Sequence, residues 1–120
     1  MNKPFSYQFY RTTAEAWDAM YQAILVAQKS IFWEIYIFID DEAGGRFIEA
    51  LCEKAKAGVE VKIVVDAIGS WGLSSLAQAR LVGSGAEVLR YNRTHPELAL
   101  GKWFNRMWRR NHRKLLVVDE

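Results

Sequence analysis

The sequence has 120 residues, 51% of them hydrophobic and 25% charged, and this composition predicts one folded globular domain rather than a disordered chain. Its single cysteine, Cys52, excludes an intrachain disulfide and a cysteine-based metal cluster, and it favours a reducing, cytoplasmic compartment. No apolar run approaches the roughly 20 residues that a membrane-spanning helix needs, so we expect any contact with a membrane to be peripheral.

The formal net charge of +2 conceals a basic segment near the end of the sequence. Residues 98–118 contain six Lys or Arg side chains and no Asp or Glu, so the rest of the chain is net acidic. A polyanion or an anionic surface is therefore expected to meet this segment rather than the whole molecule.

The first predicted elements are a helix and a strand. Thr12 and Glu15 form a capping-box signature, and apolar residues then recur at helical spacing, which predicts a helix over about 13–29. Residues 30–39 are almost continuously apolar and rich in aromatic and β-branched side chains, which predicts a strand covered on both faces. Glu34 is the one charged residue within that strand before its end.

A second helix is predicted from an apolar stripe over residues 47–55. Gly44 and Gly45 precede the stripe and are expected to break the chain, and Gly58 is suited to end the helix. Cys52 lies on the stripe and is expected to be a small buried hydrophobe.

Strands and helices continue to alternate along the chain. Residues 59–65 predict a strand, a glycine-containing turn leads to a helix over about 74–81, and residues 86–91 predict the next strand. This alternation predicts an α/β fold with a mainly parallel or mixed sheet flanked by helices. Residues 92–111 then form a long excursion that ends in an aromatic and basic stretch, GKWFNRMWRRN, and residues 112–119 predict a last strand.

The last strand carries the pattern H-x-K-x-x-x-x-D at His112, Lys114 and Asp119. Side chains alternate along a strand, so His112 and Lys114 are expected to point the same way and to contact one phosphate group. Imidazole is a competent nucleophile near neutral pH, and a lysine ammonium offsets charge on phosphate oxygens without a metal. Asp119 would lie on the opposite face, which favours a structural role in holding a lysine or backbone donors. The alternative interpretation of the pattern is that His112 lies at a sheet edge and Lys114 is a solvated charge, with no catalytic role for either.

The sequence resembles the phospholipase D superfamily and, within it, the short bacterial cardiolipin synthases without transmembrane helices. Five segments carry the resemblance: residues 34–38 (EIYIF), 58–62 (GVEVK), 66–70 (DAIGS), 83–88 (GSGAEV) and 110–119 (RNHRKLLVVD). The resemblance implies two H-x-K-x-x-x-x-D motifs at one site, with one histidine forming a phosphohistidine and the other protonating the leaving alcohol. Asp66, Ser70 and Arg110 are expected to contact the substrate, with Glu34 as a further candidate for the pocket lining. The alternative is that Asp66 and Ser70 belong to a loop that caps the next helix and that Glu34 is paired structurally.

The sequence contains one such motif, since Glu97 stands where His95 would need a lysine. We therefore expect residues 1–120 to be an incomplete N-terminal half of a phospholipase D-like fold, truncated just after the motif, inactive and poorly folded alone. The second motif would come from a missing C-terminal half or from a second chain. No cofactor is expected.

The resemblance implies an anionic, phosphatidylglycerol-like substrate and a location in the cytoplasm, peripheral at the inner membrane. Trp103, Phe104 and Trp108 suit a membrane interface, although they are equally suited to pack the excursion onto the core. Two alternatives stay open. One is a phosphodiesterase that acts on nucleic acid as a homodimer, because basic and aromatic residues also bind nucleic-acid strands. The other is a catalytically dead half-domain.

Overall fold

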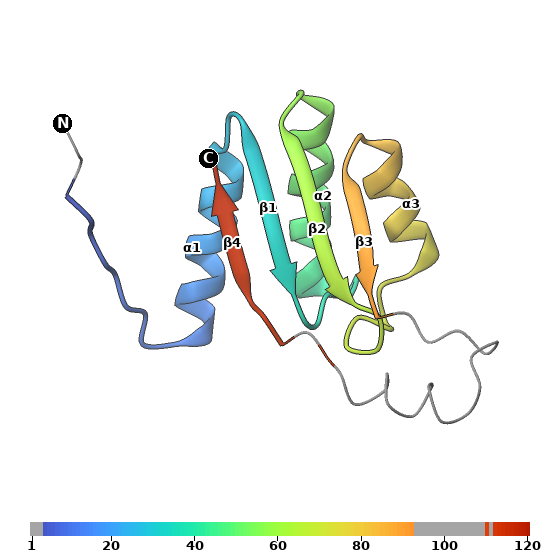
Figure 1. Ribbon diagram of the computed structural model, residues 1–120, viewed down its shortest axis with the longest axis horizontal. Helices are drawn as coiled ribbons and strands as arrows, with labels where there is room; N and C mark the ends of the chain where they lie inside the picture. Colours follow the sequence, from blue (N-terminus) through green and yellow to red (C-terminus); the bar gives the residue numbers. More distant parts are fainter. Residues whose placement is uncertain (1–3, 93–109, 111) are drawn as a thin grey trace.

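The computed structural model describes residues 4–92, 110 and 112–120. Over these residues the strands form one sheet in the order β3-β2-β1-β4, and the helices lie behind it in Figure 1. β1 (Ser30–Ile35), β2 (Glu60–Asp66) and β3 (Glu87–Tyr91) are parallel, whereas β4 (Leu115–Val118) is antiparallel to β1. The α/β class and the mixed sheet flanked by helices are thereby confirmed.

The first helix, α1 (Thr13–Val26), begins at the predicted capping box. The Thr12 hydroxyl accepts a hydrogen bond from the Glu15 N–H, and the Glu15 carboxylate accepts one from the Thr12 N–H. The helix ends three residues earlier than predicted. Residues 28–30 do not continue the helix, because their backbone N–H groups donate to the carboxylate of Asp119, about 90 positions further along the chain.

The second helix, α2 (Glu42–Lys56), includes Gly44 and Gly45, so the prediction that these glycines break the chain is wrong. The Asp41 side chain caps the helix by accepting the Gly44 N–H, and Gly44 lies so close to the Ile39 carbonyl that a Cβ there would overlap it. Glycine is needed at this helix start for close packing. Gly58 follows the helix with φ +93°, as expected of a terminating glycine.

The third helix, α3 (Ser75–Gly83), is joined to the β1–α2 connection by polar contacts. The Ser74 hydroxyl caps the helix by accepting the Ala77 N–H at 3.0 Å. Asp40 accepts both the Ser74 N–H and the Ser74 hydroxyl, at 2.9 and 2.6 Å. These hydrogen bonds, the hydroxyl first, hold the pKa of Asp40 below its usual value.

The core lies between the sheet and the helices. Along β1, Ile31, Trp33 and Ile35 are buried, whereas Phe32 and Glu34 are half-buried. This alternation corrects the expected strand over 30–39: β1 is shorter, and the described helices cover one of its faces. Cys52 is buried in the core, as predicted.

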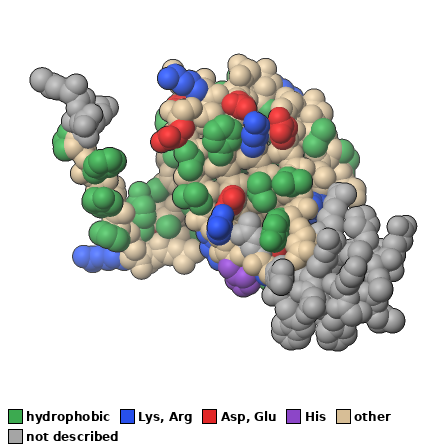
Figure 2. All heavy atoms as spheres, viewed as in Figure 1, with side chains coloured by type: hydrophobic (Ala, Val, Ile, Leu, Met, Phe, Trp, Pro, Cys, Tyr) green, Lys and Arg blue, Asp and Glu red, His purple; other side chains and the backbone are tan. Residues whose placement is uncertain are grey.

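The opposite face of the sheet points toward the viewer in Figure 2 and mixes hydrophobic, basic and acidic side chains. Its exposed or half-buried members include Phe32, Glu34, Glu60, Lys62, Glu87, Leu89 and Leu115. The Lys62 ammonium lies 2.9 Å from the Glu60 carboxylate, and this contact raises the pKa of Lys62.

Candidate active site

The predicted motif enters the structure at one edge of the sheet. The carboxyl ends of parallel strands meet at the same edge, and this is where ligands bind in open α/β sheets. β4 runs antiparallel to β1, so residues 112–114, which precede β4, reach that same edge (Figure 1). The topology therefore brings the motif beside the turns that follow β1 and β2.

His112 and Lys114 share one aromatic neighbour, Tyr36. The His112 and Tyr36 rings are stacked, with centroids 4.1 Å apart and an interplanar angle of 17°. The Lys114 Nζ lies 5.8 Å from the Tyr36 ring centroid and donates a hydrogen bond to the His112 carbonyl at 3.1 Å. Residues 112–114 precede the regular strand, so the predicted strand over 112–119 is too long. The two side chains thus meet at the Tyr36 ring rather than on one face of a pleated strand.

Asp119 lies beyond the other end of β4 and binds backbone. Its carboxylate accepts the N–H groups of Lys29 at 2.6 Å, Gln28 at 2.9 Å and Ser30 at 3.2 Å. These hydrogen bonds, that of Lys29 first, lower the pKa of Asp119. The whole of β4 separates this carboxylate from the His112 ring, which agrees with the structural role that strand alternation favoured.

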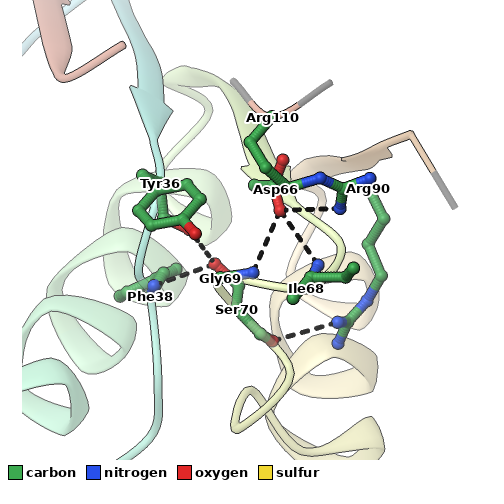
Figure 3. Close-up of polar contacts among 8 residues, drawn as sticks. All are labelled: Tyr36, Phe38, Asp66, Ile68, Gly69, Ser70, Arg90 and Arg110. Atoms are coloured by element: carbon green, nitrogen blue, oxygen red, sulfur yellow. Dashed lines mark hydrogen bonds and ion pairs between the residues drawn. The ribbon is translucent and has the colours of Figure 1, made fainter. Parts of the chain in front are cut away.

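Asp66 is fully buried at the end of β2 and joins two segments of the site (Figure 3). Its Oδ1 accepts the N–H groups of Ile68 and Gly69, each at 3.0 Å. The same oxygen accepts a hydrogen bond from the Arg110 Nη1 at 3.2 Å, and only 8% of the Arg110 side chain is exposed. Asp66 thus ties the turn after β2 to the segment that leads into the motif.

Ser70 is also fully buried and joins that turn to the end of β1. Its hydroxyl donates to the Tyr36 carbonyl and accepts the Phe38 N–H, both at 2.9 Å (Figure 3). Sequence reasoning expected Asp66 and Ser70 to contact substrate. Their burial and their hydrogen bonds favour a positioning role over direct contact.

Beside Arg110, the open face of the sheet is hollowed. The hollow measures about 440 Å³ and is lined by Glu34, Val64, Leu89, Tyr91, Arg110 and Arg113. The Arg113 guanidinium lies 3.8 Å from the Glu34 carboxylate, which is the structural pairing considered for Glu34 from sequence.

Sequence reasoning missed Tyr36 and Arg90. The sequence predicts a continuous strand over residues 30–39, in which an aromatic residue such as Tyr36 does not stand out. Arg90 donates hydrogen bonds to Gln78, to the Ser70 carbonyl and to the Leu73 carbonyl, so it stabilises the turn after β2. In the sequence, Arg90 is only a basic residue within a predicted strand, and this position does not reveal which groups it hydrogen-bonds.

Residues 4–92, 110 and 112–120 contain no group of three or more His, Cys, Asp or Glu side chains that could hold a metal ion. Across the same part of the chain, no helix is both long and apolar enough to cross a membrane. The aromatic residues Trp103, Phe104 and Trp108, considered above for membrane contact, lie outside the described residues.

The sequence of the chain is similar to those of several known proteins. No model of a protein family matches the chain. Cardiolipin synthase B of Salmonella typhi is 36% identical over 104 residues, which cover 87% of this chain. The cardiolipin synthases of Geobacillus thermodenitrificans and Clostridium perfringens are 36% and 38% identical and cover 88% and 85% of this chain.

The chain is a relative of the bacterial cardiolipin synthases. This confirms the resemblance that the motifs indicated. The chain spans 24% of the length of the Salmonella synthase and 20% of each of the other two.

Proposed function

We propose that this chain supplies one motif of the active site of a phospholipase D-type phosphatidyltransferase. The observation that carries the proposal is the pairing of exposed His112 with Lys114 on Tyr36, at the sheet edge of a chain related to cardiolipin synthases. We propose further that residues 1–120 are the N-terminal part of a phospholipase D-like domain.

The proposed chemistry has two steps. An imidazole nitrogen attacks the phosphorus of an anionic, phosphatidylglycerol-like lipid, and the bond from phosphorus to the headgroup oxygen breaks as an acid protonates that oxygen. An acceptor alcohol then attacks the phosphohistidine, loses its proton to the same group and releases the histidine. The Lys114 ammonium offsets charge on the non-bridging oxygens in both steps.

The acid requires a second motif, which we propose to come from elsewhere in a longer polypeptide or from a second chain. The 120 residues alone are then expected to transfer no lipid. Because the substrate resides in a bilayer, the site would work as a peripheral enzyme at the cytoplasmic side of the inner membrane. Arg110 is proposed to act near the phosphate, beside the hollow on the open face of the sheet.

The test is lipid transfer by the full-length protein on phosphatidylglycerol vesicles. We expect His112→Asn to lower the rate by roughly 10²- to 10⁴-fold, because the reacting imidazole is lost. His95→Asn changes the other histidine of the sequence and is the matched control, expected to keep the wild-type rate. Products are measured by separating labelled lipids.

Equal rates for His112→Asn and the wild type would contradict the assignment of His112. Cleavage of DNA without lipid transfer would replace the proposal with the nucleic-acid phosphodiesterase. No turnover of either substrate by the wild type would favour the catalytically dead half-domain.

A further inference from the structure

We infer that Tyr36 is the positioning residue of His112 and that the turn at residues 69–70 holds Tyr36 in place. The inference rests on the proposed function for its catalytic meaning, but its structural part is tested independently. It assigns a role to a residue that the H-x-K-x-x-x-x-D pattern does not contain.

The first step of the argument is what touches the His112 ring. A catalytic histidine commonly has its ring oriented by a hydrogen bond to a carboxylate or a carbonyl. Within the described part of the chain no group hydrogen-bonds to the His112 ring, and Asp119 is held at the far end of β4. The parallel stack on Tyr36 at 4.1 Å is the contact that fixes the plane of the imidazole.

The second step is what fixes Tyr36 itself. Its carbonyl accepts the Ser70 hydroxyl, and the same hydroxyl accepts the Phe38 N–H, so the backbone on both sides of residue 37 is anchored to one side chain. This side chain is fully buried, so the anchor is shielded from water. The backbone of Tyr36 is therefore held on the turn that follows β2.

The third step concerns the Tyr36 ring. Gly69 packs closely against it: a Cβ at Gly69 would lie 2.7 Å from Cε2 and 2.9 Å from Cδ2 of the ring, and 2.5 Å from the Tyr36 carbonyl oxygen. Ordinary contacts of this kind are about 3.5–4.0 Å, so no other residue type fits without moving the ring. The ring thus contacts Gly69 at its Cδ2 and Cε2 atoms and stacks on His112.

The fourth step links the turn to the motif a second time. Asp66 accepts the Gly69 N–H and also the Arg110 guanidinium, and Arg110 stands two positions before His112. The segment DAIGS thus contacts both Tyr36 and Arg110 (Figure 3), and each of these leads to His112, one by the ring stack and the other along the chain. This gives the spacing of Asp66, Gly69 and Ser70 a physical reason that does not require them to touch substrate.

The experiment observes the His112 ring protons in the full-length protein labelled with ¹³C-histidine, assigned by loss of the signal in His112→Gln. A ring stacked face to face displaces these protons upfield. We expect Tyr36→Phe to keep the upfield displacement, and Tyr36→Leu and Gly69→Ala to lose it. Trp71→Leu is the matched control, because Trp71 is an exposed aromatic residue on the same turn and is expected to change nothing.

Lipid transfer is measured on the same variants. Tyr36→Leu and Gly69→Ala are expected to lower kcat on the order of 10- to 100-fold with little change in KM, since a misplaced nucleophile reacts slowly although lipid still binds. Tyr36→Phe is expected to retain kcat. Thermal melting is recorded for every variant, and Tyr36→Leu remains the deciding variant if Gly69→Ala does not fold.

The inference is overturned if folded Tyr36→Leu keeps the wild-type His112 shift, or if it loses that shift and transfers lipid at the wild-type rate. A wild-type protein that transfers no lipid would end the proposed function instead. In that case the spectra still decide whether Tyr36 holds His112.

Discussion

The carboxylate of Asp119 accepts hydrogen bonds from three consecutive backbone N–H groups, those of residues 28–30. This contact ends α1 and places the start of β1 against the end of β4. Asp119, although it belongs to the same sequence pattern as His112, thus stabilises β4 at the end of the strand that lies away from His112.

We expect Asp119→Asn to lower thermal stability at neutral pH, because the amide keeps one acceptor oxygen but loses the charge. The pKa of Asp119 is lowered in the folded protein, so its stabilising effect is complete above the unfolded value of about 3.9. It is lost as pH falls through the lower, folded pKa. Melting curves of both proteins from neutral to acid pH should therefore converge below about pH 4. A stability difference that stays constant as pH falls well below 4 would contradict the assignment.

A second residue-scale prediction compares a buried and an exposed ion pair. Asp66→Ala leaves the Arg110 charge buried and is expected to cost about 3–5 kcal/mol of unfolding free energy. Glu49→Ala removes an exposed partner of Arg80, at 3.6 Å, and is expected to cost about 0–1 kcal/mol. Urea denaturation of the full-length protein measures both. Similar costs for the two variants would show that the Asp66 pair is not the anchor we describe.

At this scale the sequence identifies residues that fit a catalytic pattern but not residues that hold them. His112 and Lys114 form a spaced pattern with a chemical meaning, so they can be found in a single sequence. Tyr36 is separated from His112 by 76 positions, and its role follows from a ring contact that no local spacing encodes. The burial of Asp66 and Ser70 could likewise not be predicted from the sequence, because polar residues in a glycine-containing turn are usually exposed.

At the scale of elements, the connections after β1 and β2 are joined by Asp40 and Ser74. Ser74→Ala removes the α3 cap and is expected to cost about 1 kcal/mol, within the range for helix caps. Asp40→Ala removes the partner of the same hydroxyl, so the double variant should cost less than the sum of the two. The test compares the denaturation midpoints of the wild type, the two single variants and the double variant. Strict additivity would contradict a shared hydrogen-bond unit.

Local chemistry predicted the start of α1 and the end of α2, but not the end of α1 or the start of α2. The capping box of α1 and the glycine after α2 are sequence signals with fixed geometry, and both are present. The end of α1 depends on Asp119, a distant partner. The inclusion of Gly44 in α2 depends on close contact with Ile39, so the low helix propensity of glycine was overridden by packing.

At the scale of the whole molecule, alternation of strands and helices was enough to predict the α/β class, because parallel strands are connected by helical crossovers that pack on the sheet. It did not predict that β4 pairs antiparallel beside β1, since register between distant strands is set by tertiary contacts. That pairing is what brings His112 to the edge where β1 and β2 end.

The strand order has a further consequence for the growing chain on the ribosome. β1, β2 and β3 pair with successive neighbours, so they can associate as each is synthesised, whereas the contact of Asp119 with Lys29 closes a separation of 90 residues. Non-local contacts of this kind form late because loop closure must come first. His112 thus joins a sheet that is already built, and a nascent chain that stops before β4 would have a parallel sheet without His112 at its edge.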